Sequence, residues 1–215
     1  MKIHKNLDSI INSIPSGIKL VAVSKTKPID QIKLAYDYGQ KDFGENKVQE
    51  LVNKYNSLNK DIRWHMIGHL QRNKVKFIAP FIHLIHSVDS YRLLKEINKQ
   101  GFKCNRLINI LVQIDISNDN SKFGFSYSEV EELVNKNELN SFKNICVKGF
   151  MGMASFTDNQ KKIGLEFKSL NNFYLKYKDS LKLDTLSMGM SGDYKIALEN
   201  NSNMIRLGSS IFGSR

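Results

Sequence analysis

The chain has 215 residues, of which 41% are hydrophobic and 25% are charged, and this length and composition are typical of one globular domain with a buried core. The net charge of +11 would suit a nucleic-acid partner, but the lysines are scattered and only six of the 32 basic residues are arginines, so we expect no DNA or RNA ligand. Two cysteines without C-x-x-C spacing, an N-terminal segment without an apolar core and no run of about 20 apolar residues predict a cytoplasmic protein without a signal peptide, a disulfide framework or a membrane span.

In chain order, short apolar runs rich in β-branched residues alternate with amphipathic helical patterns. An amphipathic stretch over residues 3–14 comes first. Eight strands are then predicted at residues 18–24, 42–44, 64–67, 84–88, 108–116, 145–151, 185–188 and 204–207. Helical patterns between them cover residues 29–38, 48–58, 90–99, 128–135, 160–178 and 194–200. Strands that are separated by crossover helices predict a parallel sheet and an α/β fold.

Eight strand–helix units predict a closed (β/α)₈ barrel of the TIM type, although the same periodicity also suits an open, doubly wound sheet. Only eight residues follow the last predicted strand, fewer than a full final helix needs. We therefore expect residues 3–14 to form an additional N-terminal helix that covers the barrel wall at this point. No linker-like stretch divides the chain, and residues 1–215 are predicted to form one domain.

Lys25 comes directly after the apolar run at residues 20–23. The carboxyl ends of the strands form the working face of such barrels, so the Lys25 side chain is predicted to point into the barrel mouth. The alternative is a surface lysine that projects sideways into solvent. In the mouth, partial burial would favour the neutral amine that forms an imine with a carbonyl group. Lys27 is a weaker candidate, because Thr26 and Pro28 place it in the following loop.

Two glycine- and serine-containing loops, residues 188–193 and 206–210, follow the seventh and eighth predicted strands. Barrels of this type often bind phosphate at these two loops. Glycines such as Gly208 let the backbone approach an anion, and the hydroxyl groups of Ser191 and Ser209 can donate hydrogen bonds to its oxygens. An imine-forming lysine and a phosphate site together are the minimum that pyridoxal 5'-phosphate (PLP) requires.

Five longer stretches resemble a known family. They cover residues 21–28, 43–50, 64–74, 186–191 and 205–215. From about residue 18 to the carboxyl terminus the chain resembles the PLP homeostasis protein family, which is similar in fold to the barrel domain of alanine racemase. The resemblance implies a protein that buffers PLP or delivers it to PLP-dependent apo-enzymes, and so contributes to vitamin B6 and amino-acid homeostasis. It also implies a monomer without conventional catalytic turnover.

The same resemblance implies roles for individual residues. Lys25 would hold PLP as an internal aldimine, and Arg206 would face the pyridine nitrogen. The other implied contacts are Asn46 and Met188 near the ring, and Ser191, Gly208 and Ser209 at the phosphate. A loop lysine, Lys122, would approach the mouth of the barrel.

The histidines are given structural interpretations. His65 and His69 have the i,i+4 spacing of a helical zinc site, but Gly68 lies between them and no glutamate follows His65, so we predict no metal ion. His83 and His86 would fall on opposite faces of a strand, which prevents them from chelating one ion together.

Two other groups of residues also have simple interpretations. Glu45 and Glu50 resemble a carboxylate pair, but Glu50 lies in a helical pattern and is predicted to be solvated or to form an ion pair. Methionines at strand ends are predicted to fill the core: Met151, Met153, Met188 and Met190.

Three classes of function remain open on the residues alone. The first is a non-catalytic PLP carrier, and the second is a PLP enzyme such as an amino-acid racemase or decarboxylase. The third is a class I aldolase, in which Lys25 would form the imine directly with a substrate. A visible absorption band of the purified protein separates the first two classes from the third, and turnover of amino acids separates the carrier from the enzyme.

Overall fold

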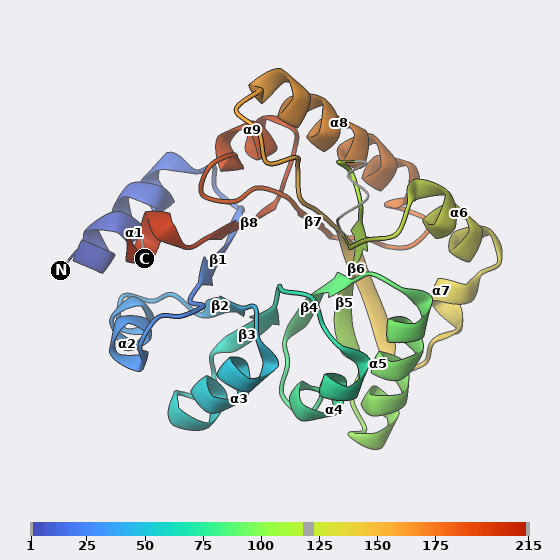
Figure 1. Ribbon diagram of the computed structural model, residues 1–215, viewed down its shortest axis with the longest axis horizontal. Coiled ribbons are helices and arrows are strands. Elements are labelled where there is room, and N and C mark those ends of the chain that lie inside the picture. Colours follow the sequence, from blue (N-terminus) through green and yellow to red (C-terminus); the bar gives the residue numbers. More distant parts are fainter. Residues whose placement is uncertain (1, 118–122, 214–215) are drawn as a thin grey trace.

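A closed barrel of eight parallel strands forms the centre of the molecule (Figure 1). The computed structural model describes residues 2–117 and 123–213. The strands are β1 Lys19–Val23, β2 Asp42–Glu45, β3 Arg63–Met66, β4 Leu84–Val88, β5 Ile108–Ile114, β6 Ile145–Gly152, β7 Thr185–Ser187 and β8 Met204–Leu207. Each strand pairs with the next, and β1 pairs with β8 in parallel register from Lys19 opposite Met204. The prediction of a closed barrel is therefore confirmed, and the open-sheet alternative is wrong.

Helices surround the barrel and follow the predicted pattern closely (Figure 1). The longer helices are α1 Lys2–Ser13, α2 Ile29–Asp37, α3 Val48–Ser57, α5 Tyr91–Lys103, α6 Tyr127–Asn135, α8 Gln160–Tyr177 and α9 Tyr194–Glu199. Short elements that the sequence pattern did not predict are η1 Arg72–Lys74, α4 Val75–Ile78, α7 Glu138–Ser141 and α10 Ser209–Phe212. Within the described residues, no helix combines the length and the apolar character that crossing a membrane requires.

The N-terminal helix α1 lies beside the short final helix α10 (Figure 1). Ile3, Leu7 and Ile10 are its buried residues, and their spacing places them on one face of the helix. The Asn6 side chain donates a hydrogen bond to the carbonyl oxygen of Ile211 at 2.8 Å, which ties α1 to α10. The expectation that an N-terminal helix covers this part of the barrel wall is confirmed.

Alternate side chains of each strand point either into the barrel or towards the helices. A small apolar cluster fills the barrel interior: Val21, Leu84, Leu111, Met151 and Met204. The larger cluster, with Phe43, Trp64 and Phe150, lies between the strands and the helices. Because β1 places Lys19, Val21 and Val23 on its interior face, Lys25 continues that face at the carboxyl end of the barrel.

Candidate functional site

A cavity of about 400 Å³ lies at the carboxyl ends of the strands, within the range that small-molecule sites usually have. Six of the seven predicted cofactor-binding residues line it: Lys25, Asn46, Ser191, Arg206, Gly208 and Ser209. Met188 is the exception, because its side chain is fully buried and lies outside the cavity lining. Met190 was expected to fill the core, but it is 40% exposed and lines the cavity, so that prediction was wrong.

The loop that carries Lys25 is held in an unusual backbone conformation. Thr26 has a φ of 64°, which is strained for a β-branched residue. Its backbone N–H donates to the Glu50 carboxylate at 2.6 Å, and this bond compensates for the strain by fixing the loop to α3. Lys25 itself is half-buried. The loop therefore presents the Lys25 side chain from a fixed position at the rim of the cavity.

Beneath this loop lies a buried ion pair that sequence reasoning missed. Lys54 of α3 donates to the carboxylates of Glu45 and Glu50, each at 2.7 Å, and Ser24 donates its hydroxyl hydrogen to Glu45 at 2.6 Å. Burial raises the pKa of the Glu45 carboxyl, and Lys54 opposes that rise. The Glu50–Lys54 spacing of i,i+4 was the available signal, and Glu50 is an ion-pair partner, as predicted.

The loops after β7 and β8 meet at the cavity. The Ser191 hydroxyl oxygen accepts a hydrogen bond from the Gly208 backbone N–H at 3.3 Å, and Asp193 accepts one from the Met190 N–H at 2.6 Å. Gly189 has a φ of +91°, and a Cβ atom there would lie 2.7 Å from the Ala197 Cβ, so only glycine fits. The two predicted phosphate loops thus form one continuous wall of the cavity.

Arg206 supplies a buried positive charge beside the cavity. The residue is only 4% exposed, and its guanidinium donates to the Ser187 hydroxyl oxygen at 2.5 Å and to the Gly152 carbonyl oxygen at 3.2 Å. Burial lowers the pKa of Arg206 to about 10, while the charge of Asp193 acts in the opposite direction. The guanidinium therefore remains a cation at neutral pH.

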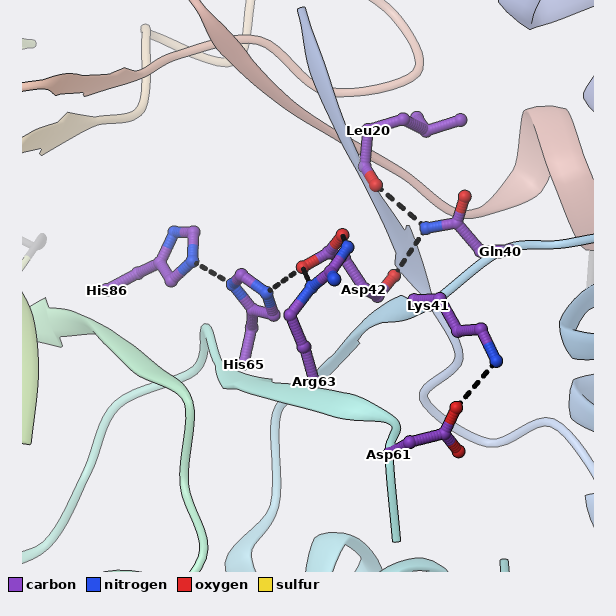
Figure 2. Close-up of polar contacts among 8 residues, drawn as sticks. All are labelled: Leu20, Gln40, Lys41, Asp42, Asp61, Arg63, His65 and His86. Carbon is purple, nitrogen blue, oxygen red and sulfur yellow. Dashed lines mark hydrogen bonds and ion pairs between the residues drawn. The ribbon is translucent and has the colours of Figure 1, made fainter. Parts of the chain in front are cut away.

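A line of buried side chains continues from Ser187 into the barrel. The Ser187 hydroxyl lies 3.2 Å from Nδ1 of His86, and Nε2 of His86 lies 2.9 Å from Nδ1 of His65. Nε2 of His65 in turn lies 2.9 Å from the Asp42 carboxylate, which Arg63 also contacts through two nitrogens (Figure 2). The i,i+4 spacing had suggested His69 as the neighbour of His65. In the structure the neighbours of His65 are His86 on β4 and Asp42 on β2.

The sequence spacing suggested His65 and His69 as a possible zinc pair, but the structure brings a different set of residues together. Asp42, His65 and His83 offer ligand atoms within 4.8 Å of one another, whereas His69 is bound to Asp89 at 2.8 Å. Two hydrogen bonds from Arg63 already engage Asp42, and a guanidinium beside the carboxylate opposes the binding of a second cation. This group is therefore better described as an ion-pair and hydrogen-bond cluster.

An aromatic contact joins the segment after β3 to the segment after β5. The His69 ring stacks on Phe123 with ring centroids 3.9 Å apart and an interplanar angle of 18°. Phe123 remains 56% exposed. The implied loop lysine, Lys122, precedes it and lies outside the described residues.

Comparisons with known proteins extend along the whole chain. The family model for the N-terminal domain of alanine racemase matches residues 1–215. A pyridoxal phosphate homeostasis protein of Pasteurella multocida is 35% identical over 231 residues, which cover 100% of this chain and 98% of that protein. PipY of Synechococcus elongatus has been solved without PLP and with PLP bound; the TM-scores are 0.93 and 0.90 at 30% and 29% identity. Both comparisons cover 98% of this chain and 100% of the PipY chain.

Proposed function

Because the chain belongs to the pyridoxal phosphate homeostasis protein family, we propose that it binds PLP in the cavity at the carboxyl ends of the strands, through an imine to Lys25. In this proposal the protein is a carrier that buffers PLP or delivers it to apo-enzymes, and it is not an enzyme. The observation that carries the proposal is the convergence of Lys25, Arg206 and the Ser191–Gly208 contact on one cavity.

The residues present fit PLP chemically. The cavity volume of about 400 Å³ suits a ligand of this size. The Lys25 amine is the nucleophile that an aldehyde requires, and formation of the imine releases one water molecule. The Ser191 hydroxyl hydrogen remains available for a phosphate oxygen, because its oxygen is the acceptor in the bond with Gly208. Gly208 and Ser209 belong to the same wall. The fit of a PLP-sized anion thus rests on residues from both loops.

Arg206 is the main reason for proposing a carrier. PLP, when bound, supplies an electron sink, and that sink is strongest when its pyridine nitrogen is protonated. A buried guanidinium that faces this nitrogen repels a second positive charge. Asn46, from the loop after β2, is proposed to lie beside the ring; Met188 is fully buried outside the cavity lining and is not proposed to contact the ring. In this proposal Arg206 weakens the cofactor as an electron sink and so slows turnover at an amino-acid α-carbon.

We also propose that residues 1–215 act as one domain, as a monomer and in the cytoplasm; the described residues that line the proposed site all come from this one chain. Light scattering of the PLP-loaded protein should give the mass of one chain. An obligate dimer with PLP at the interface would contradict this part of the proposal.

The test of the carrier function combines a spectrum with two assays. The purified protein should show a visible band that borohydride abolishes, and it should restore activity to a PLP-dependent apo-enzyme. Incubation with a panel of L-amino acids should yield no sustained formation of D-amino acid, amine or keto acid. Multiple turnovers that are lost in Lys25→Ala would indicate a PLP enzyme, and turnover of an aldol substrate without a visible band would indicate a class I aldolase.

A further inference from the structure

A second cavity lies at the opposite end of the barrel. Its volume is about 490 Å³, and its lining includes Asp42, Arg63 and His65. Asp42 and Arg63 are the first residues of β2 and β3, and His65 follows within β3, whereas Arg206 lines the cavity at the carboxyl ends. The line of hydrogen bonds through Ser187, His86 and His65 therefore joins the two cavities through the barrel interior. We call these five residues the relay: Arg206, Ser187, His86, His65 and Asp42.

The two ends of the relay fix its direction. The Arg206 guanidinium can only donate hydrogen bonds, and an ionised carboxylate can only accept them. Although burial alone would raise it, hydrogen bonds from Arg63 and His65 hold the pKa of the Asp42 carboxyl well below its usual range. Asp42 is thus an anion at neutral pH, and the relay has a donor at one end and an acceptor at the other.

With both rings neutral, the acceptor at Asp42 leaves one proton arrangement for the members in between. Ser187 accepts from Arg206 and donates its own hydrogen to Nδ1 of His86, because the neutral His86 ring carries its proton on Nε2. His86 then donates from Nε2 to Nδ1 of His65, and His65 donates from Nε2 to Asp42. Both rings are neutral in this arrangement. Their burial supports it, because His65 is 1% exposed and His86 is fully buried, and burial lowers the pKa of each.

We propose that this one-way chain of hydrogen bonds makes Ser187 and His86 positioning residues for Arg206, and that it couples the Asp42 carboxylate to the PLP cavity. The proposal rests on the proposed function, because it assigns Arg206 to the pyridine ring. Each neutral member is polarised by the next, so the Ser187 oxygen becomes a better acceptor for the guanidinium than an isolated hydroxyl. The relay thereby supports an arginine cation that, among the described residues, receives no carboxylate contact.

The first test uses the PLP-free protein. Long-range proton–nitrogen NMR spectra at pH 7 should show His65 and His86 as neutral rings that are protonated at Nε2. A ring protonated at Nδ1, or a charged ring, would overturn the proposed direction. This measurement needs no substitution, so it does not depend on whether a variant folds.

The coupling along the relay is tested with Asp42→Asn. An amide can donate as well as accept, so the acceptor-only end is lost. The ring nitrogens of His86 should then shift, although Asp42 bonds to His65 and not to His86. The matched control is His83→Gln. The His83 ring lies 5.3 Å from that of His65 but is not a member of the relay. Unchanged His86 signals in Asp42→Asn, or equal shifts in both variants, would overturn the coupling.

The effect on the PLP cavity is tested with Ser187→Ala. We expect the Kd for PLP to rise roughly 2- to 10-fold, as for the loss of one hydrogen bond, with a shift of the visible band. Thr185→Val is the control, since it removes another buried hydroxyl from β7 that bonds to Asp184 instead. An unchanged Kd and spectrum in Ser187→Ala would refute the positioning role and leave the proposed function intact. If the wild-type protein binds no PLP, the proposed function fails, and the NMR spectra still decide the relay.

Discussion

The Lys54 ammonium group donates a hydrogen bond to the backbone carbonyl oxygen of Ser24 at 2.7 Å, and Ser24 is the residue that precedes Lys25. The same ammonium group neutralises Glu45, whose side chain is fully buried. One buried cation on α3 therefore fixes the end of β1 and balances the charge beneath it. This arrangement explains how the loop can hold Thr26 in a strained conformation next to the proposed PLP lysine.

Replacing Lys54 should be strongly destabilising. Lys54→Met leaves the Glu45 carboxylate buried without its cation, and such a loss typically costs about 3–5 kcal/mol. Without Lys54 the pKa of Glu45 in the folded state rises further above its unfolded value. The extra destabilisation should therefore be small near pH 4.5 and grow as the pH increases.

Urea unfolding at pH 5 and pH 8 measures both effects. Lys41→Met is the matched control, because it breaks the Lys41–Asp61 pair in which the side chains are 34% and 57% exposed. It should have little effect at either pH. Equal destabilisation by the two variants would contradict the described role of Lys54.

Ser191→Ala should weaken the binding of PLP and not that of pyridoxal. The lost bond to a charged phosphate is worth about 1.5–3 kcal/mol, or roughly 10- to 150-fold in Kd. Pyridoxal lacks the phosphate, so its imine with Lys25 should form with nearly unchanged affinity. Spectroscopic titration with the two ligands gives both constants, and an equal loss for both would rule out a phosphate site at this wall.

Two glycines of one loop should respond differently to alanine. Gly189→Ala places a Cβ 2.7 Å from the Ala197 Cβ at a φ of +91°, and a strained residue of this kind costs of the order of 1–3 kcal/mol. At Gly192 a Cβ would meet no atom within 4 Å, so Gly192→Ala should unfold at nearly the wild-type temperature. Thermal unfolding of the two variants tests this difference. Equal unfolding temperatures would show that the loop rearranges to accept the Gly189→Ala side chain and would contradict the prediction.

The stability of the protein should decrease below pH 6.5. The pKa of His65 and of His86 is lowered by burial, so the unfolded chain binds protons at a higher pH than the folded protein does. Stability is therefore retained above the unfolded pKa of about 6.5 and lost as the pH falls below it, by at most about 1.4 kcal/mol per pH unit for each ring. Unfolding free energies measured from pH 8 to pH 5 should show this slope, and His86→Gln should reduce it. A flat profile in the wild-type protein would contradict burial of the neutral rings.

Much of the architecture could be predicted because local periodicity determines it. The short apolar runs and the turn signals between them identified all eight strands, although most strand ends differ slightly from the predicted bounds. The largest difference is in β5, which ends at Ile114 instead of residue 116. The elements α4 and α7 were missed because each has only four residues, too few to show a helical period. The cavity lining was predicted through strand ends, which always meet at one face of a barrel.

The relay could not be predicted from the sequence. Ser187 and His86 are 101 residues apart, and their contact depends on which side chains meet across the closed barrel. Periodicity assigns a residue to a face but does not identify its partner on a distant strand. Likewise, the i,i+4 spacing of His65 and His69 was uninformative, because Gly68 lies outside β3 and the two rings point to different partners.

The most direct test of the proposed function is to locate the PLP adduct. The PLP-loaded protein is reduced with borohydride and digested, and the modified peptide is identified by mass spectrometry, with Lys27→Ala as the matched control for Lys25→Ala. We expect one phosphopyridoxyl group on Lys25, present in Lys27→Ala and absent in Lys25→Ala. A group on Lys27 or another lysine in the wild-type protein, or an undiminished adduct in Lys25→Ala, would contradict the assignment of Lys25 as the PLP lysine.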